Sequence, residues 1–375
     1  MKIVVASDSF KGTMSAVDAC RAIASGVAQA CPSAEIVQIP VADGGEGTVD
    51  AFVGAGAQRV YVDGVADALG RKRRGCYCIL ADGETAVVES AEAVGITHLL
   101  PEERNVMAAD SQGLATLFDD AVKRGCRNIL VGLGGSATND GGLGLLAGLG
   151  YVFKDAGGVV LHTYGGGALS SVAEIDGTYR RKYLDEVKFT VLCDVDATFC
   201  GDNGAACVFA RQKGADDNDI LLLDKGMRSF AEVVRKTTGV NIAELPGAGA
   251  AGGLGGAFAA FMNARLLPGI DTVLRVVGFD DAAEGADYVI TGEGAIDAQS
   301  LMGKVTVGVL SRCRDKDVKV IVFAGRVENK NKLLSVGFAD VTEVAVPEDE
   351  KEKALEPSNA FENLKNTVSS YFTQI

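Results

Sequence analysis

The sequence predicts an α/β protein of two domains, and three observations support this. The chain has 375 residues, which exceeds the usual length of one domain. Hydrophobic residues make up 47% of it, enough for a sizeable core, and its 48 glycines gather where apolar runs end. The recurring order of strand, glycine-rich turn and helix is typical of α/β folds.

The first elements of the chain follow this order. Lys2–Ala6 has the apolar pattern of a short buried strand. Ser15 and Asp18 have the spacing of a capping box, which predicts a helix start. The apolar face of that helix is formed by Val17, Cys20, Ala24 and Val27. Ile36–Val41 is the next expected strand, and together these elements begin the first domain.

Residues 58–90 differ in character from the segments around them. They alternate between polar and apolar positions, and Asp-Gly pairs at 63–64 and 82–83 are hairpin signals. We therefore expect antiparallel strands here and a domain boundary near residue 60. Because the last strands resemble the first, we expect residues 1–60 and 286–375 to form one discontinuous domain. Residues 61–285 would then be a mixed α/β domain inserted into it.

Parallel strand-and-helix character returns after residue 90. Apolar residues from Leu114 to Val122 have helical spacing, and Gly125 follows as a stop signal. The last helix is expected to begin after an Asn359 cap, with Glu362 at its third position. Further strands are expected at Asn128–Leu133, Phe189–Leu192, Tyr288–Ile290 and Val318–Phe323.

Charge and composition exclude several classes of function. A net charge of −14 disfavours nucleic acid or an anionic membrane as a partner. The nine cysteines form no CxxC pair, which indicates reduced thiols in a cytoplasmic protein. Only His98 and His162 are present, too few for a histidine-based zinc site and poor material for a serine–histidine triad. The N-terminus lacks the apolar region of a signal peptide, and the composition leaves an oligomer open.

The loop after Asn128–Leu133 has more glycine and polar residues than a strand-to-helix connection requires. Successive backbone N–H groups at a helix start bind anions, and side-chain hydroxyls can add hydrogen bonds. The alternative is a tight turn in which Thr138, Asn139 or Asp140 caps the following helix. The candidate binding residues of this loop are Gly134, Gly135, Ser136, Thr138, Asn139 and Asp140.

Similar polar residues follow four other expected strands, and ligands of open α/β sheets bind outside the carboxyl ends of strands. No phosphate-binding P-loop is present, because Val305 follows Gly303-Lys304, and no dinucleotide-binding GxGxxG motif is present. The candidates at these strand ends are Asp8, Ser9, Lys11, Asp43, Gly44, Gly45, Glu46, Asp194, Glu293, Asp297 and Lys304. The excess of carboxylates suits Mg²⁺ and supplies a general base. These residues therefore favour phosphoryl transfer to a small hydroxylated acceptor.

Five motifs in this order resemble the type-I bacterial glycerate kinases: DSFKGTMSA at 8–16, ADGGEGT at 42–48, GGSATNDGG at 134–142, GAGAAGGLG at 247–255 and TGEGAIDAQSLMGK at 291–304. The resemblance spans roughly residues 1–310. It implies ATP-dependent phosphorylation of D-glycerate to 2-phosphoglycerate with Mg²⁺. It also implies two α/β domains, one of them Rossmann- or flavodoxin-like with a parallel sheet, and an active site in the cleft between them.

The sequence departs from this family at two places. Ala197-Thr198-Phe199 stands where the family usually has Asn-Pro-Leu, which makes substrate contacts near Asp194 less certain. Thr306 stands where a proline is usual, a change expected to affect only a helix start. Under this resemblance, the glycine-rich loop at 134–142 is expected to bind either a phosphate or the glycerate carboxylate through its backbone N–H groups.

Roles follow for the charged candidates. Asp43 is expected to accept the proton of the glycerate hydroxyl, and Asp194 to hold the metal, although both could instead be helix caps. Lys11 and Lys304 are the only cations in these motifs and are expected to bind anions. Three other functions stay open: formation of 3-phosphoglycerate, phosphorylation of another small hydroxy acid, and non-catalytic sensing of a phosphorylated metabolite.

Overall fold

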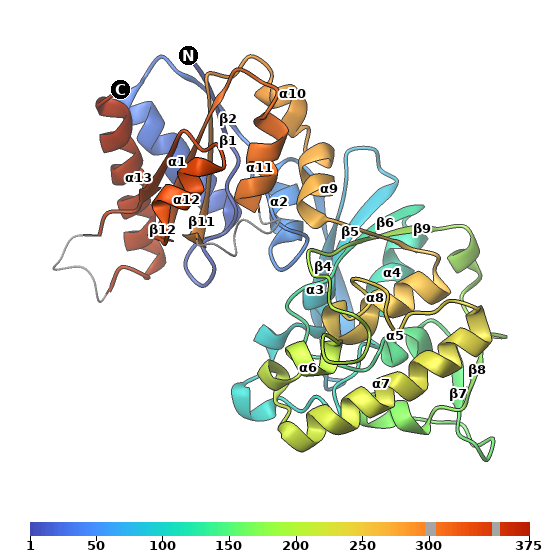
Figure 1. Ribbon diagram of the computed structural model, residues 1–375. Helices are drawn as coiled ribbons and strands as arrows, with labels where there is room; N and C mark the ends of the chain where they lie inside the picture. The colour runs from blue at the N-terminus through green and yellow to red at the C-terminus, as the bar shows by residue number, and fades with distance from the viewer. Residues whose placement is uncertain (297–304, 347–352) are drawn as a thin grey trace. The chain divides into compact units, whose positions relative to one another are not determined.

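The computed structural model describes residues 1–296, 305–346 and 353–375. Contacts divide these residues into two compact units. Unit 1 contains Met1–Asp43, Asp50–Gly56 and Pro268–Ile375, and unit 2 contains Gly44–Val49 and Ala57–Leu267. Each unit has its own sheet (Figure 1). The later change of unit falls at Pro268 rather than after residue 285, since the helices that follow Pro268 pack with those of unit 1.

Unit 1 is built on a parallel sheet in the order β13-β12-β11-β1-β2. When these five strands are numbered 1 to 5 along the chain and the sheet is read from β2, the order is 2-1-3-4-5. This is the order of flavodoxin-like folds, which confirms the expected fold class. Two strands are longer than expected, because β11 and β12 keep pairing as far as Ile296 and Val327. The strands are β1 (Lys2–Val5), β2 (Glu35–Gln38), β11 (Tyr288–Ile296), β12 (Lys319–Val327) and β13 (Asp340–Glu343).

Helices cover both faces of the unit 1 sheet (Figure 1). On one face, α1 (Ala16–Ala30) packs against α13 (Pro357–Thr373), and Gly26 permits the close approach of the two backbones. The Ser15 cap is confirmed, since its hydroxyl accepts the Asp18 N–H at 3.1 Å. The last helix starts earlier than expected, with Pro357 in its first turn. The others are α2 (Thr48–Gly54), α9 (Gly269–Val276), α10 (Phe279–Ala283), α11 (Val305–Cys313) and α12 (Lys330–Ser335).

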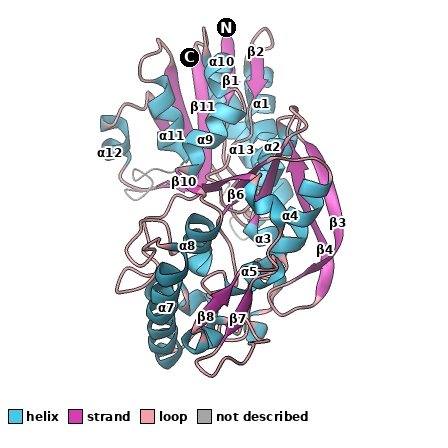
Figure 2. Cartoon of the chain, turned by 90° about the vertical axis from the view of Figure 1, so that its right-hand side faces the viewer, coloured by secondary structure: helices cyan, strands magenta, loops and turns pink. Residues whose placement is uncertain are grey.

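Unit 2 contains a mixed sheet in the order β10-β9-β6-β5-β4-β3. The expected antiparallel strands are confirmed: β3 and β4 form a long hairpin, visible in Figure 2, and β4 pairs with β5. The remaining neighbours pair in parallel. The strands are β3 (Gln58–Ala66), β4 (Lys72–Ile79), β5 (Thr85–Glu89), β6 (Asn128–Gly132), β9 (Lys188–Leu192) and β10 (Arg265–Leu267), with β7 (Val152–Lys154) and β8 (Glu174–Asp176) as a separate pair.

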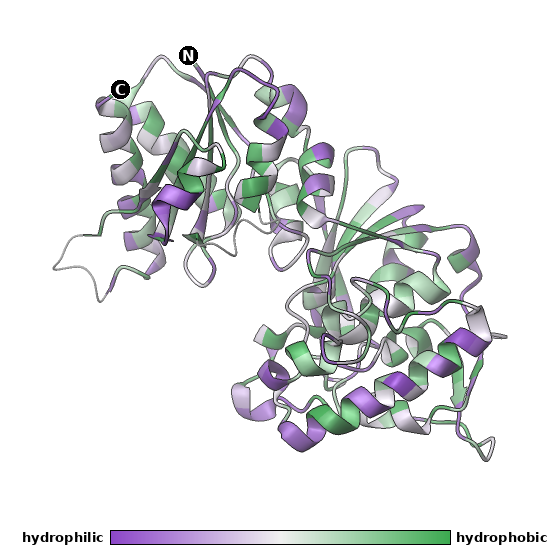
Figure 3. Cartoon of the chain, viewed as in Figure 1, coloured by the Kyte–Doolittle hydropathy of each residue, from purple (hydrophilic) through white to green (hydrophobic). Residues whose placement is uncertain are grey.

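The core of unit 2 is aliphatic with a small aromatic cluster. In this cluster the rings of Phe118 and Phe189 pack edge to face, with their centroids 5.4 Å apart. Hydrophobic and hydrophilic residues alternate along α7, as expected of a helix with one buried face (Figure 3). None of the helices in the described ranges is long and apolar enough to cross a membrane. The helices are α3 (Ser90–Val94), α4 (Leu114–Lys123), α5 (Leu143–Gly148), α6 (Ala205–Phe209), α7 (Asp217–Thr238) and α8 (Ala250–Phe261).

Candidate functional site

Unit 1 gathers charged side chains at the carboxyl ends of its central strands. Asp8 follows β1 and is 8% exposed, and its Oδ1 accepts the Ser9 N–H at 2.6 Å. Burial raises the pKa of Asp8 to about 7, helped by the charges of Asp43 and Glu293, while the Ser9 N–H and Lys11 act in the opposite direction. Five of the predicted residues, Asp43 among them, therefore share one electrostatic neighbourhood.

Glu293 lies within β11 rather than in a loop, because β11 pairs with β12 beyond its expected end. Its side chain is buried, and Oε1 accepts the Thr306 hydroxyl at 3.1 Å. The expectation that Thr306 affects only a helix start is therefore incomplete. A proline at this position would have no hydroxyl to offer Glu293.

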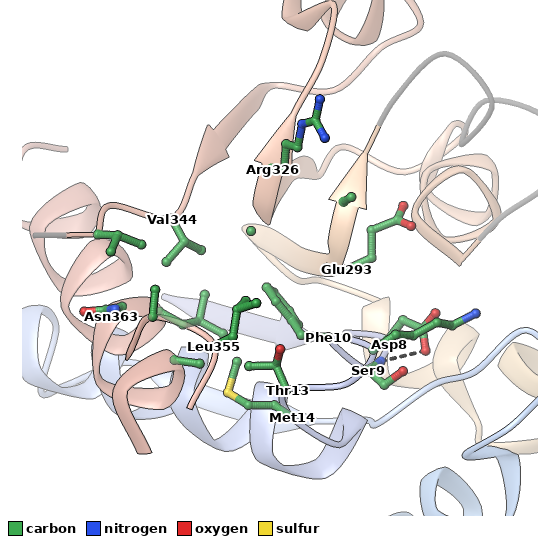
Figure 4. A pocket seen from close by; sticks show the side chains of 18 of the residues that line it. Asp8, Ser9, Phe10, Thr13, Met14, Glu293, Arg326, Val344, Leu355 and Asn363 are labelled. Atoms are coloured by element: carbon green, nitrogen blue, oxygen red, sulfur yellow. Dashed lines mark hydrogen bonds between the residues drawn. The ribbon is translucent and has the colours of Figure 1, made fainter. Parts of the chain in front are cut away.

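A cavity of about 510 Å³ opens beside these charges, within unit 1. It lies outside the carboxyl ends of β1, β11, β12 and β13, where ligands of this sheet type bind. Figure 4 shows Asp8, Ser9 and Glu293 towards one end and Val344, Leu355 and Asn363 towards the other. We call this the unit 1 cavity.

Two glycine-rich segments predicted from the sequence meet inside unit 2. Gly134 lies so close to Gly45 that a Cβ on Gly134 would be 2.7 Å from the Gly45 Cα. A Cβ on Gly132 would likewise collide with the Gly44 carbonyl oxygen. Glycines in both segments are therefore required for close backbone contact.

Glu89 and Ser90 support these segments, and the sequence analysis missed both. The buried Glu89 carboxylate accepts the N–H of Gly47 at 3.1 Å and also that of Val49. The Ser90 hydroxyl donates to the Gly134 carbonyl at 3.2 Å. The sequence does contain a signal for Glu89, because this acidic residue stands at the end of the buried strand β5. The predicted residues stand at the ends of other strands in the same way.

Only the first part of the loop at 134–142 is accessible. Gly135 is exposed and has a φ of 65°, and Ser136 is 4% exposed. Thr138, Asn139 and Asp140 are fully buried. Among the hydrogen bonds of the described residues, none uses the N–H groups of Gly135 and Ser136, whereas the Ala137 N–H donates to the Val94 carbonyl.

Asp140 is held by hydrogen bonds within unit 2. Its carboxylate accepts the Ser111 N–H and hydroxyl, both at 2.7 Å, and the N–H groups of Gly142 and Gly144 at 3.0 and 3.1 Å. Burial raises the pKa of Asp140, and these hydrogen bonds oppose that rise. The N-cap residue of α5 is Gly142, so the expectation that Asp140 occupies that position is wrong, although its bonds to Gly142 and Gly144 hold it at the start of this helix.

Lys213 is a third residue that was not predicted from the sequence. It is 3% exposed, and its Nζ donates to the Thr138 carbonyl at 2.7 Å and to the Ser136 hydroxyl oxygen at 3.1 Å. Burial lowers the pKa of Lys213 to about 7, although the charge of Asp140 raises it. Lys11 and Lys304 are therefore not the only cations associated with the motifs.

The remaining candidates are more dispersed. Asp194 is exposed in the loop after β9 of unit 2, and Glu46 is exposed beside Gly135. Asp297 and Lys304 lie outside the described residues. Within the described ranges, no three histidine, cysteine or acidic side chains form a group that could hold a metal ion by themselves.

The fold and these side chains define an α/β protein with a parallel sheet and a cavity lined by charged residues in unit 1. The chain matches the model of the glycerate kinase family over residues 3–375. It is 41% identical to glycerate 2-kinase of Escherichia coli over 87% of this chain and 85% of the relative. It is 40% identical to glycerate kinase of Bacillus cereus, covering 87% and 86%.

A solved structure gives the same result. The crystal structure assigned to glycerate kinase 2 of Salmonella typhimurium LT2 superposes with a TM-score of 0.88 at 36% identity, covering 100% of this chain and 98% of that chain. The chain belongs to the glycerate kinase family and is an enzyme of that family. The resemblance carried by the five sequence motifs is thereby confirmed.

Proposed function

We propose that this enzyme transfers the γ-phosphoryl group of ATP to the 2-hydroxyl of D-glycerate, forming 2-phosphoglycerate and ADP. The observation that carries the proposal is the clustering of Asp8, Lys11, Asp43 and Glu293 at the strand ends of unit 1, in a chain of the glycerate kinase family. The choice of the 2-hydroxyl is supported by the relative named glycerate 2-kinase.

Asp43 accepts the proton of the attacking hydroxyl in this proposal. Phosphoryl transfer requires that hydroxyl to be aligned with the γ-phosphorus and its proton to be removed. The charge of Asp43 contributes to the raised pKa of Asp8, so Asp8 retains a proton up to about neutral pH. The two carboxyl groups therefore have different tasks: Asp8 donates a hydrogen bond, and Asp43 accepts the proton.

Anionic groups of the substrates need donors in a protein of charge −14. Lys11 lines the unit 1 cavity and supplies a charge-assisted bond to phosphate. The N–H groups of Gly135 and Ser136, which no hydrogen bond among the described residues uses, are assigned to the glycerate carboxylate together with the Ser136 hydroxyl. Gly44, Gly45 and Gly134 keep that backbone in place, and Glu46 lies beside it.

The residues present fit Mg²⁺ bound together with the nucleotide. Asp194 and Asp196 are exposed in one loop, and the described residues form no complete protein-only metal group. Mg²⁺ typically takes one or two carboxylates and completes its shell with phosphate oxygens and water. When bound, the ion neutralises charge on the transferred phosphoryl group. We assign Asp194 to hold it.

We place the enzyme in the cytoplasm. All nine cysteines lie in the described part of the chain, and no disulfide joins them. Cysteines without disulfides are the usual state in a reducing compartment.

An ADP-release assay with and without D-glycerate tests the proposal. We expect ADP to form only when both ATP and D-glycerate are present. A panel of glycolate, lactate and tartronate tests the alternative hydroxy acids, and a higher kcat/KM for one of them would replace D-glycerate as substrate. Failure to release ADP with any acceptor would contradict a kinase and favour the sensing function.

A further inference from the structure

The unit 1 cavity has an apolar end that glycerate cannot use. Phe10 and Met14 line it from the loop after β1, Val344 from the end of β13, and Ala360 and Leu364 from α13. Phe10, Met14 and Leu364 are at most 8% exposed, so packing fixes their positions. Glycerate consists almost entirely of polar groups and gains nothing from apolar walls, whereas a flat heterocycle does.

Asn363 adds a polar group to this apolar end. It lines the unit 1 cavity from α13, is 6% exposed, and its Nδ2 is buried with no hydrogen-bond partner among the described residues. Its main-chain carbonyl is engaged, since it accepts the Thr367 hydroxyl at 2.8 Å. An unsatisfied buried amide is costly, so one in a ligand-sized cavity points to a missing partner. A 180° turn of the amide presents either the oxygen or the nitrogen.

The amide of asparagine matches one heterocycle in particular. Its adjacent acceptor and donor pair with the exocyclic amine and a ring nitrogen of adenine, as they do in protein–DNA recognition. On the base edge that carries N7, guanine presents two acceptors, O6 and N7. The asparagine amide, with one donor and one acceptor, cannot pair with both of them in either orientation, so on this edge it discriminates between the two bases.

Lys11 and Arg326 lie among the cavity residues that are suited to phosphate. Both side chains line the unit 1 cavity, and Arg326 is 73% exposed and pairs with Glu328. Asp43 and Glu293 also line the cavity, and their negative charges would repel a bare polyphosphate, so the nucleotide enters with a divalent cation. Figure 4 separates Asp8 and Glu293 from Asn363, as a ligand with an aromatic head and a charged tail requires.

We propose that the unit 1 cavity binds the nucleotide substrate, with the adenine between α13 and Phe10 beside the Asn363 amide, and the phosphates directed towards Lys11. This inference rests on the proposed kinase function, because that function requires a nucleotide substrate. The inference adds that the nucleotide binds in unit 1.

Direct binding of ADP to the full chain tests this assignment without catalysis. We would titrate ADP with Mg²⁺ by calorimetry into the wild type, Asn363→Leu and Asn366→Leu. Asn366 is the matched control, since it is exposed on the same helix. We expect Asn363→Leu to weaken ADP binding about 10-fold or more and to lose the preference for ADP over GDP, with Asn366→Leu unchanged. In the kinetic assay, KM for ATP should rise while KM for D-glycerate stays constant.

A second variant keeps the test decisive if Asn363→Leu does not fold. Leu355 lines the cavity but is 75% exposed, so Leu355→Asp places a charge at the apolar end without disturbing the core. Weaker ADP binding by Leu355→Asp supports the assignment. Unchanged ADP binding in both folded variants would overturn it, even if the enzyme phosphorylates D-glycerate. An enzyme that binds ADP at Asn363 but never phosphorylates D-glycerate would instead overturn the proposed function.

Discussion

Units 1 and 2 both place polar residues at the carboxyl ends of parallel strands, but they use them differently. In unit 1, Asp8, Lys11, Asp43 and Glu293 line an open cavity. In the glycine-rich loop of unit 2, Thr138, Asn139 and Asp140 are buried, as is Lys213, which is bonded to that loop, and only Gly134 and Gly135 reach the surface. The difference separates side chains that can meet a ligand from side chains that hold a loop in shape.

The free-energy cost of burial explains why the buried charged residues Asp140 and Lys213 are hydrogen-bonded, whereas the Thr138 hydroxyl and the Asn139 side-chain oxygen have no partner among the described residues. A buried carboxylate or ammonium is unfavourable unless it is paired and hydrogen-bonded. Asp140 meets this requirement with four donors, and Lys213 with two acceptors. Asp8 does not meet it to the same degree, and its pKa is raised to about 7. Groups with perturbed pKa values in a cavity are candidates for function.

The largest effect is expected from Asp43→Asn, which keeps the side-chain shape but cannot accept a proton. We expect kcat to fall by about 10²-fold or more, the lower range of general-base effects, with the Mg²⁺ dependence unchanged. Asp63→Asn, at an exposed position of the β3–β4 hairpin, is the control and should retain full kcat.

Asp194→Asn completes this first test. It should raise the Mg²⁺ concentration needed for the half-maximal rate. If Asp43→Asn keeps full kcat while Asp194→Asn loses it at saturating Mg²⁺, the two roles are reversed.

Gly135→Val tests whether the accessible part of the unit 2 loop meets a ligand. Gly135 has a φ of 65°, so valine strains the backbone and its branched side chain covers the neighbouring N–H groups. Gly158→Val is the matched control, because Gly158 has a φ of 79° and open space around it. Both variants should lose similar thermal stability, but only Gly135→Val should lose kcat/KM for D-glycerate. Equal activity in the two variants would make Gly135 a structural turn.

Ser111→Ala examines the buried half of unit 2. The Ser111 hydroxyl donates to Asp140 and accepts the Leu145 N–H at 2.9 Å, so its removal leaves both groups short of a partner. We expect the free energy of unfolding in urea to fall by about 1–3 kcal/mol, with kcat and both KM values unchanged. Ser170→Ala, at an exposed position, should change neither. A loss of activity without a loss of stability would place Ser111 and Asp140 in contact with substrate.

Lys213→Met should give a smaller, pH-dependent effect. The pKa of Lys213 is lowered to about 7 in the folded protein, whereas lysine in an unfolded chain titrates near 10.4. Between these values the unfolded chain binds a proton that the folded protein does not, so wild-type stability rises with pH relative to Lys213→Met. The gain is at most about 1.4 kcal/mol per pH unit. Melting from pH 7 to 9 measures it, with Lys72→Met, at an exposed position, as a control that should show a constant difference.

The comparison of the two units also shows what the sequence could predict. The strands and helices of unit 1 and the hairpin in unit 2 follow from local patterns, because alternation, caps and glycine positions are properties of neighbouring residues. The order of the strands in each sheet depends on tertiary packing and was not predicted from these patterns. Lys213 could not be found in this way. It lies 77 residues from Ser136 along the chain, and tertiary packing alone buries it beneath the loop.

Asp8 and Asp140 illustrate the same limit within the candidate site. Both are acidic residues at strand ends, and the sequence makes them equal candidates. The structure distinguishes them by their partners, since Asp140 is bonded by Ser111 from a distant segment and Asp8 lines the cavity. Those partners depend on the packing of the whole unit.

The phosphorus spectrum of the product tests the central claim most directly. After incubation of the enzyme with ATP, Mg²⁺ and D-glycerate, proton-coupled ³¹P NMR reports how many hydrogens the esterified carbon carries. We predict a doublet, because the 2-carbon of glycerate carries one hydrogen, together with an equal amount of ADP. A triplet would show transfer to the 3-hydroxyl, and the absence of any new phosphate ester would contradict the proposed reaction.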